Sequence, residues 1–167
     1  YALQNDGELG KYEIWYILSA DPDAQIIYGL KTGTTRDIFE TAIAEGNIGA
    51  YLNEIPVKTG EVYIIPPGLV HTLQKGILVF EIAQNSDTVY RIYDFNRAGF
   101  DGKPRDLHIS KALDVIRFDD FLPPHPINPR LNSRLIDSPL FKVDYCLQRG
   151  AMEFFNSGGR FFILTNV

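Results

Sequence analysis

The sequence predicts a mainly β protein, and three observations lead to this prediction. Segments rich in β-branched and aromatic residues, which favour strands, recur along the 167 residues. Ten prolines and fourteen glycines supply turns between these segments. The 45% of hydrophobic and 22% of charged residues match a globular chain that is long enough to bury a core. We therefore expect short strands, joined by turns, around one main core.

The first expected strand covers residues 11–19, where apolar and aromatic residues dominate. Side chains alternate between the two faces of a strand, so Lys11, Glu13 and Trp15 share the face that should point inward. Further strands are expected at 26–31, 61–66, 76–83, 88–95, 141–148 and 160–167.

Short helices are expected at two places. Thr35 is the expected N-cap of a helical stretch over about 36–52, which two glycines divide into two short helices. Ser110 is expected to cap another helix that runs to Ile116.

The prolines divide the chain into two units. A β-barrel domain is expected over 1–118 and an extended Pro-rich linker over 119–139. Residues 140–167 are then the beginning of a second β unit. Because no Met stands at position 1 and the chain stops within an apolar run, both ends are expected to be boundaries within a longer protein. The alternative for 161–167 is an ordinary last central strand.

Charge and cysteine content limit the partners and the compartment. The net charge of -5 argues against nucleic acid or an anionic membrane as the main partner, although a few local cations can still bind one phosphate. No run is long enough to span a membrane, and no secretory signal opens the sequence. Cys146, the single cysteine, cannot form an internal disulfide and fits a reducing cytoplasm. The oligomeric state stays open between monomer and homodimer.

The most informative segment runs from Gly60 to His71 and fits the pattern G-x5-P-x-G-x2-H, the second cupin motif. Gly60 allows a tight turn before a strand, and Pro66 and Gly68 turn the chain sharply after it. His71 is thereby delivered onto the next strand and should face into the barrel. The motif predicts a cupin double-stranded β-helix, or jelly-roll barrel, with His71 as a metal ligand.

One histidine does not make a metal site, because zinc takes about four ligands. Glu13 is the best partner, since a carboxylate on an inward face needs a cation or strong donors. The alternative is that Glu13 lies at a wet mouth of the barrel and pairs with Lys11. His108, His125 and Cys146 are expected to be surface or structural residues rather than ligands.

Two further charged residues interrupt apolar faces of expected strands. Glu81 shares a face of its expected strand with Ile77 and Val79, and Arg91 shares a face with Val89 and Tyr93. The two residues either neutralise each other as a structural ion pair or join one inward-facing polar cluster that lines a pocket. In the second case the cluster consists of Lys11, Glu13, His71, Glu81 and Arg91.

Taken together, four segments resemble the class I phosphomannose isomerases in their short bacterial form. Residues 10–16 resemble the G-K-x-E-x-W-Y strand of this family, and residues 60–71 resemble its histidine turn. Residues 84–94 are similar to its Q-x-S-D-x-x-Y-R-x-Y-D segment, and residues 102–109 match the next block. The resemblance covers about 1–118, and beyond the linker it extends to the start of the family's smaller cupin-like C-terminal domain.

The resemblance implies a zinc enzyme that interconverts mannose 6-phosphate and fructose 6-phosphate through a cis-enediol. It places Glu13 and His71 on two zinc ligands, Lys11 on an active-site lysine and Arg91 on the active-site arginine. Glu81 matches an acidic residue near the site. The two remaining ligands, a histidine and a glutamine in a Q-V-H-P-type motif, are expected just before Tyr1, and this stretch is absent from the sequence.

Several alternatives remain open from the sequence. The group that abstracts the proton is Glu81, a hydroxide on the metal or a residue outside the sequence. The rival functions are an Fe(II) cupin oxygenase and a non-catalytic sugar-binding cupin or inactive fragment. Because part of the expected ligand set is missing, we expect weak or no activity from these 167 residues alone.

Overall fold

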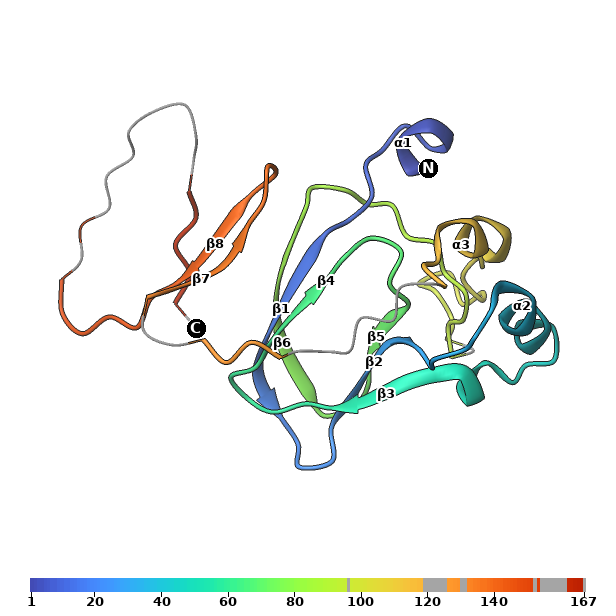
Figure 1. Ribbon diagram of the computed structural model, residues 1–167, viewed down its shortest axis with the longest axis horizontal. Helices are drawn as coiled ribbons and strands as arrows, with labels where there is room; N and C mark the ends of the chain where they lie inside the picture. The colour runs from blue at the N-terminus through green and yellow to red at the C-terminus, as the bar shows by residue number, and fades with distance from the viewer. Residues whose placement is uncertain (96, 119–125, 130–131, 152, 154–161, 167) are drawn as a thin grey trace.

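Two antiparallel sheets of three strands each form the centre of the computed structural model (Figure 1). The structure describes residues 1–167 except 96, 119–125, 130–131, 152, 154–161 and 167. One sheet has the order β4 (Val62–Ile65), β1 (Glu13–Ala20) and β6 (Ile77–Ala83). The other has the order β3 (Leu52–Pro56), β2 (Gln25–Leu30) and β5 (His71–Leu73). The prediction of a mainly β chain is therefore confirmed.

The main core lies between these two sheets. Trp15 and Ile17 of β1 pack there against Ile26 of β2 and Ile65 of β4, and all four side chains are buried. This is the burial that the alternation in β1 predicted. The face of β1 that points inward is thus also the face that carries Glu13.

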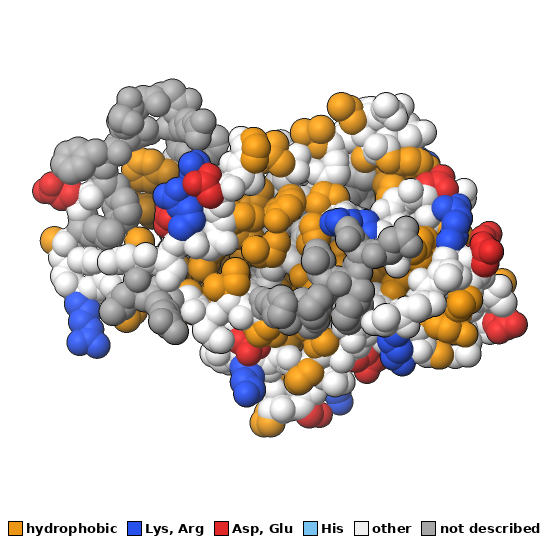
Figure 2. Space-filling view, viewed as in Figure 1, with side chains coloured by type: hydrophobic (Ala, Val, Ile, Leu, Met, Phe, Trp, Pro, Cys, Tyr) orange, Lys and Arg blue, Asp and Glu red, His pale blue; other side chains and the backbone are white. Residues whose placement is uncertain are grey.

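The opposite face of β1 is covered as well. Ile14 lies in a second cluster with Leu135 and Ile136, which belong to β7 (Ser133–Asp137). β7 pairs with β8 (Lys142–Tyr145) in a hairpin beside the barrel (Figure 1). Hydrophobic side chains gather on the surface between the hairpin and the barrel (Figure 2). Burial on both faces explains why β1 reads as an almost continuous apolar run.

Short helices lie at the other end of the barrel. Thr35 caps α2 (Arg36–Ala44) by accepting a hydrogen bond of 3.3 Å from the Ile38 amide, and the 3-10 helix η1 (Ile48–Tyr51) follows. The prediction of two short helices is confirmed. α3 (Ile109–Val115) packs with α2 against β2, through Leu113, Phe39 and Ile27. A further short helix, α1 (Ala2–Asn5), was not predicted.

One predicted strand, 88–95, is wrong, since this segment has no strand in the structure. The alternation of charged and apolar residues indicated one buried face, but Val89, Tyr93 and Phe95 are exposed. The backbone of Arg91 bonds instead to His108, with its N–H donating to the ring and its carbonyl accepting from the His108 amide. Bonds to His108 thus take the place of pairing with a neighbouring strand at Arg91.

Other boundaries also differ from the sequence prediction. β3 was missed, because the predicted helical stretch ended at 52 and no element was assigned to the residues that follow. β7 lies within the segment predicted as an extended linker. The described residues 162–166 form no strand, and the rest of the predicted strand 160–167 lies outside the described residues. Ser110 lies inside α3, whose N-cap is His108.

Within the described parts of the chain, no helix is both long enough and apolar enough to cross a membrane.

The turn between β4 and β5 fixes the position of His71. Gly68 has a φ of +84°, which side chains other than glycine rarely adopt. A Cβ atom at this position would lie 2.5 Å from the carbonyl oxygen of Val115 at the end of α3. The Gly68 carbonyl also accepts a hydrogen bond of 3.2 Å from the Arg117 amide. Glycine is therefore required here for its conformation and for this close approach.

Replacing Gly68 by alanine should test this turn, with Gly33 as the matched control. Gly33 has a φ of +85° but no atom within 4 Å of an added Cβ. Gly33→Ala should lower the free energy of unfolding by about 1–2 kcal/mol, from backbone strain alone. Gly68→Ala should lower it by a further ~1–3 kcal/mol, because the methyl group overpacks against α3. Urea unfolding measures both, and equal losses would contradict the contact described above.

Candidate active site

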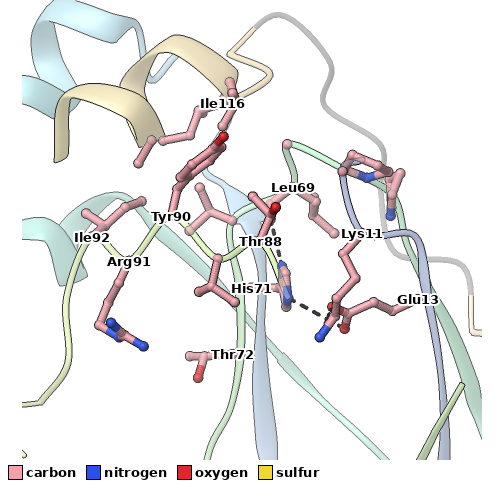
Figure 3. Close-up of a pocket in the computed structure, with 18 of the residues that line it drawn as sticks. Lys11, Glu13, Leu69, His71, Thr72, Thr88, Tyr90, Arg91, Ile92 and Ile116 are labelled. Carbon is pink, nitrogen blue, oxygen red and sulfur yellow. Dashed lines mark hydrogen bonds and ion pairs between the residues drawn. The ribbon is translucent and has the colours of Figure 1, made fainter. Parts of the chain in front are cut away.

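A pocket of about 1050 Å³ opens between the two sheets and α3. Its wall contains all five residues that the sequence predicted for one polar cluster, some of which Figure 3 shows. These residues are Lys11, Glu13, His71, Glu81 and Arg91. The structure therefore brings the whole predicted set to one pocket, although the five side chains have different partners within it.

Glu13 and His71 come from the two different sheets and meet inside the barrel. The Glu13 side chain is almost fully buried, and its Oε2 atom lies 3.8 Å from His71 Nε2. His71 Nδ1 lies 2.8 Å from the Leu69 carbonyl oxygen. Because a carbonyl only accepts, Nδ1 donates in this contact, and in the neutral form of the ring the lone pair then lies on Nε2. This lone pair and the carboxylate are both suited to a metal ion.

Trp15 holds this pair in place. Its indole Nε1 donates a hydrogen bond of 3.1 Å to Glu13 Oε2. Its ring lies edge-to-face with the His71 ring at a centroid distance of 5.3 Å. Both contacts follow from the alternation in β1, which places Glu13 and Trp15 on the same face.

Lys11 provides positive charge beside the buried carboxylate. Its Nζ lies 3.1 Å from Glu13 Oε1 and 3.3 Å from Glu81 Oε1. Partial burial disfavours the charged form of Lys11, but the neighbouring Glu13 and Glu81 outweigh this effect and raise its pKa. Glu81 lies opposite Trp15 in the pairing of β1 with β6, which explains why it reaches the same side of the sheet.

Arg91 reaches the pocket from the irregular segment that replaces the predicted strand. Its Nη1 donates a hydrogen bond of 2.9 Å to the Asp106 carbonyl, and its Nε lies 3.7 Å from Asp94 Oδ1. In the view of Figure 3, Arg91 and Lys11 lie on opposite sides of His71. The described ion pairs join Glu81 to Lys11 and Arg91 to Asp94, so the polar residues form two separate groups.

Four further charged residues of the pocket wall, Asp94, Arg97, Arg105 and Asp114, were not predicted as site residues. Asp94, Arg97 and Arg105 line the pocket together with Arg91. Hydrogen bonds from Arg105 and then from Arg97 lower the pKa of Asp94 to about 2. Asp94 lies within the segment that showed the family resemblance, but a strand prediction placed it on the face opposite Arg91.

The other candidate nitrogen and sulfur ligands lie elsewhere. The His108 ring accepts a hydrogen bond of 3.1 Å from the Arg91 amide, which is a structural role. Cys146 is exposed near the end of β8. His125 lies outside the described residues.

The residues of this pocket supply part of a metal site. An imidazole nitrogen and a carboxylate oxygen are donors that zinc prefers. In the described ranges of the chain, however, no group of three or more histidine, cysteine, aspartate and glutamate residues could hold a metal ion. Glu13 and His71 therefore fit zinc as two members of a ligand set, with Lys11 close enough to Glu13 to compete for the carboxylate.

The chain is similar in sequence to known proteins. No protein-family model matches the chain. The chain is 45% identical over 116 residues to the mannose-6-phosphate isomerase of Streptococcus mutans, a match that covers 70% of this chain and 36% of that protein. It is 38% identical over 143 residues to the mannose-6-phosphate isomerase ManA of Bacillus subtilis, covering 86% of this chain and 45% of that protein.

The fold also matches a solved structure of a mannose 6-phosphate isomerase. The crystal structure of the mannose 6-phosphate isomerase from Bacillus subtilis matches with a TM-score of 0.72 at 34% sequence identity, over 85% of this chain and 47% of that chain. The chain thus spans between about a third and a half of the length of these relatives. The predicted cupin fold is confirmed by this match. By sequence and by fold, the chain is therefore similar to a part of these mannose-6-phosphate isomerases.

Proposed function

We propose that this chain carries one wall of the active site of a zinc-dependent mannose-6-phosphate isomerase. The observation that carries the proposal is the meeting of Glu13 and His71 from two different sheets, with Lys11, just before β1, beside them. A buried carboxylate, an imidazole with a free nitrogen and a charged amine at one point of a pocket are typical of a catalytic site. The names of the relatives supply the reaction and the sugar phosphate substrate.

The reaction moves one proton from C2 of the aldose to C1, through a cis-enediol. Negative charge develops on the oxygens of C1 and C2 during this step, so the protein must stabilise it. When bound, zinc would supply a Lewis acid for these oxygens. Glu13 and His71 are the residues of this chain that would hold it, and Trp15 would keep Glu13 oriented through its hydrogen bond.

Two cationic side chains act on the substrate directly in this proposal. Lys11 lies beside Glu13, so its ammonium group can donate to the developing enediolate. Arg91 stays charged at all relevant pH values and therefore suits an oxyanion or a phosphate rather than the role of base. The apolar wall near His71, which includes Trp15 and Leu69, limits the access of water.

Loss of either proposed ligand should weaken zinc binding. We expect His71→Ala and Glu13→Gln to reduce Zn²⁺ affinity at least about tenfold, because the first removes the imidazole donor and the second replaces the carboxylate by a neutral amide. Trp15, the single tryptophan, contacts both residues, so its fluorescence reports directly on binding. Glu54→Gln is the matched control, since Glu54 lies exposed on β3 and outside the pocket wall. Unchanged zinc affinity in both variants would contradict the assignment of Glu13 and His71 as zinc ligands.

Binding of the substrate should depend on Arg91. We expect Arg91→Lys to weaken mannose 6-phosphate binding about tenfold, because lysine retains the charge but loses the planar pair of donors. Calorimetry measures the affinity, and a coupled assay for fructose 6-phosphate measures turnover. Arg134→Lys is the control, since Arg134 lies on β7 and pairs with Asp144. If the unaltered chain bound neither zinc nor mannose 6-phosphate, the proposed function would be wrong.

A further inference from the structure

Asp94 has an unusual set of partners at the end of the pocket away from Lys11. Its carboxyl group is only 6% exposed. Among the described residues, three arginines surround it. Arg105 binds both of its oxygens, with Nε donating to Oδ2 at 2.7 Å and Nη2 donating to Oδ1. Arg97 Nη2 donates to Oδ1 at 2.9 Å, and Arg91 Nε lies 3.7 Å from the same atom.

The chain is folded so that these arginines converge from different positions in the sequence. The Gly99 amide donates to the Lys103 carbonyl at 2.7 Å, and Ala98 forms a bridge with Pro104. This turn returns Arg105 to Asp94. Arg91 is held from another direction by the Asp106 carbonyl. Asp94 is therefore the common point at which the three guanidinium groups meet.

The charges in this group do not balance. Three guanidinium groups and one carboxylate leave an excess of two positive charges in the described group. A structural ion pair would need only one cation for each carboxylate, and additional cations repel one another. Arg97 and Arg105 are 61% and 40% exposed, so both remain accessible beside the buried Asp94.

The opposite end of the pocket has the reverse charge. There Lys11 contacts the two carboxylates of Glu13 and Glu81, which leaves one negative charge among these described residues. Such a pocket attracts a cation at one end and an anion at the other. A phosphate monoester fits the arginine end, because guanidinium groups form paired hydrogen bonds with phosphate oxygens.

We propose that Asp94 is a positioning residue that holds Arg91, Arg97 and Arg105 in place to bind the phosphate monoester of the substrate. An arginine has five N–H donors, and the bonds to Asp94 use only some of them. Asp94 thus fixes the orientation of the guanidinium groups while leaving donors for the ligand. That this ligand is a sugar phosphate rests on the function proposed above.

The test compares Asp94→Asn with the unaltered chain for three ligands: mannose 6-phosphate, mannose and inorganic phosphate. We expect Asp94→Asn to bind mannose 6-phosphate about tenfold more weakly and to bind mannose unchanged. Removing a negative charge makes the pocket more positive, so charge alone predicts tighter binding of the phosphate. Tighter or equal binding of mannose 6-phosphate by Asp94→Asn would therefore overturn the positioning role.

Two controls keep this result interpretable. Asp137→Asn removes a carboxylate that also pairs with two cations, Arg134 and Lys142, but lies in the hairpin outside the pocket wall, so it should leave all three affinities unchanged. Should Asp94→Asn fail to fold, Arg105→Lys keeps the charge and loses the contact with both oxygens of Asp94. It should weaken phosphate binding in the same way, and unchanged binding would count against the proposal.

The three ligands also separate this inference from the proposed function. If the unaltered chain binds inorganic phosphate but not mannose 6-phosphate, and Asp94→Asn weakens phosphate binding, the positioning role stands and the isomerase proposal fails. If the chain binds mannose 6-phosphate and Asp94→Asn binds it equally well, the isomerase proposal stands and the positioning role fails.

Discussion

The contact of the Glu13 carboxylate with its neighbours is the interaction on which the rest of the site depends. A carboxylate that is almost fully buried is stable only when charges and donors surround it. Lys11, His71 and Trp15 meet this need from three directions. The barrel is built so that these groups converge, since β1 and β5 lie in facing sheets and share one core. The same convergence places the two proposed zinc ligands, Glu13 and His71, at one point of the pocket.

One buried carboxylate in each half of the pocket explains its division into two groups. Glu13 collects the cationic lysine and the imidazole around itself, and Asp94 collects three arginines among the described residues. Glu13 and His71 of the first group lie on strands, whereas the second group lies on an irregular segment held by side-chain bonds. Chemistry that tolerates little displacement suits the strands. Recognition of a charged substituent suits the more irregular segment.

Local patterns in the sequence predicted much of the fold and the first group of the site. The alternation in β1 placed Glu13 and Trp15 inside the barrel, and the glycine-proline turn placed His71 opposite them. These signals work because a strand has two faces and a turn has strict backbone requirements. Alternation also placed Lys11 and Arg91 in the predicted cluster, and the family resemblance gave them active-site roles. The pocket wall contains both residues.

The missed features depend on contacts between distant residues. The segment around Arg91 alternates like a strand, but its partners are His108 and Asp94 rather than a neighbouring strand. No local pattern reveals that Arg105 returns to Asp94, because the turn that brings it back is defined by its own hydrogen bonds. β3 was also missed, because its pairing with the distant β2 rather than its composition makes it a strand.

α3 touches both halves of the pocket, and this has a geometric consequence. Its N-cap, His108, binds the backbone of Arg91, while its last residue, Val115, lies against the turn that carries Gly68. Seven helical residues span about 10 Å. The helix therefore acts as a spacer of fixed length, which sets how far the arginine end stands from the histidine turn. The number of residues in this short helix therefore contributes to the separation of the two ends of the pocket.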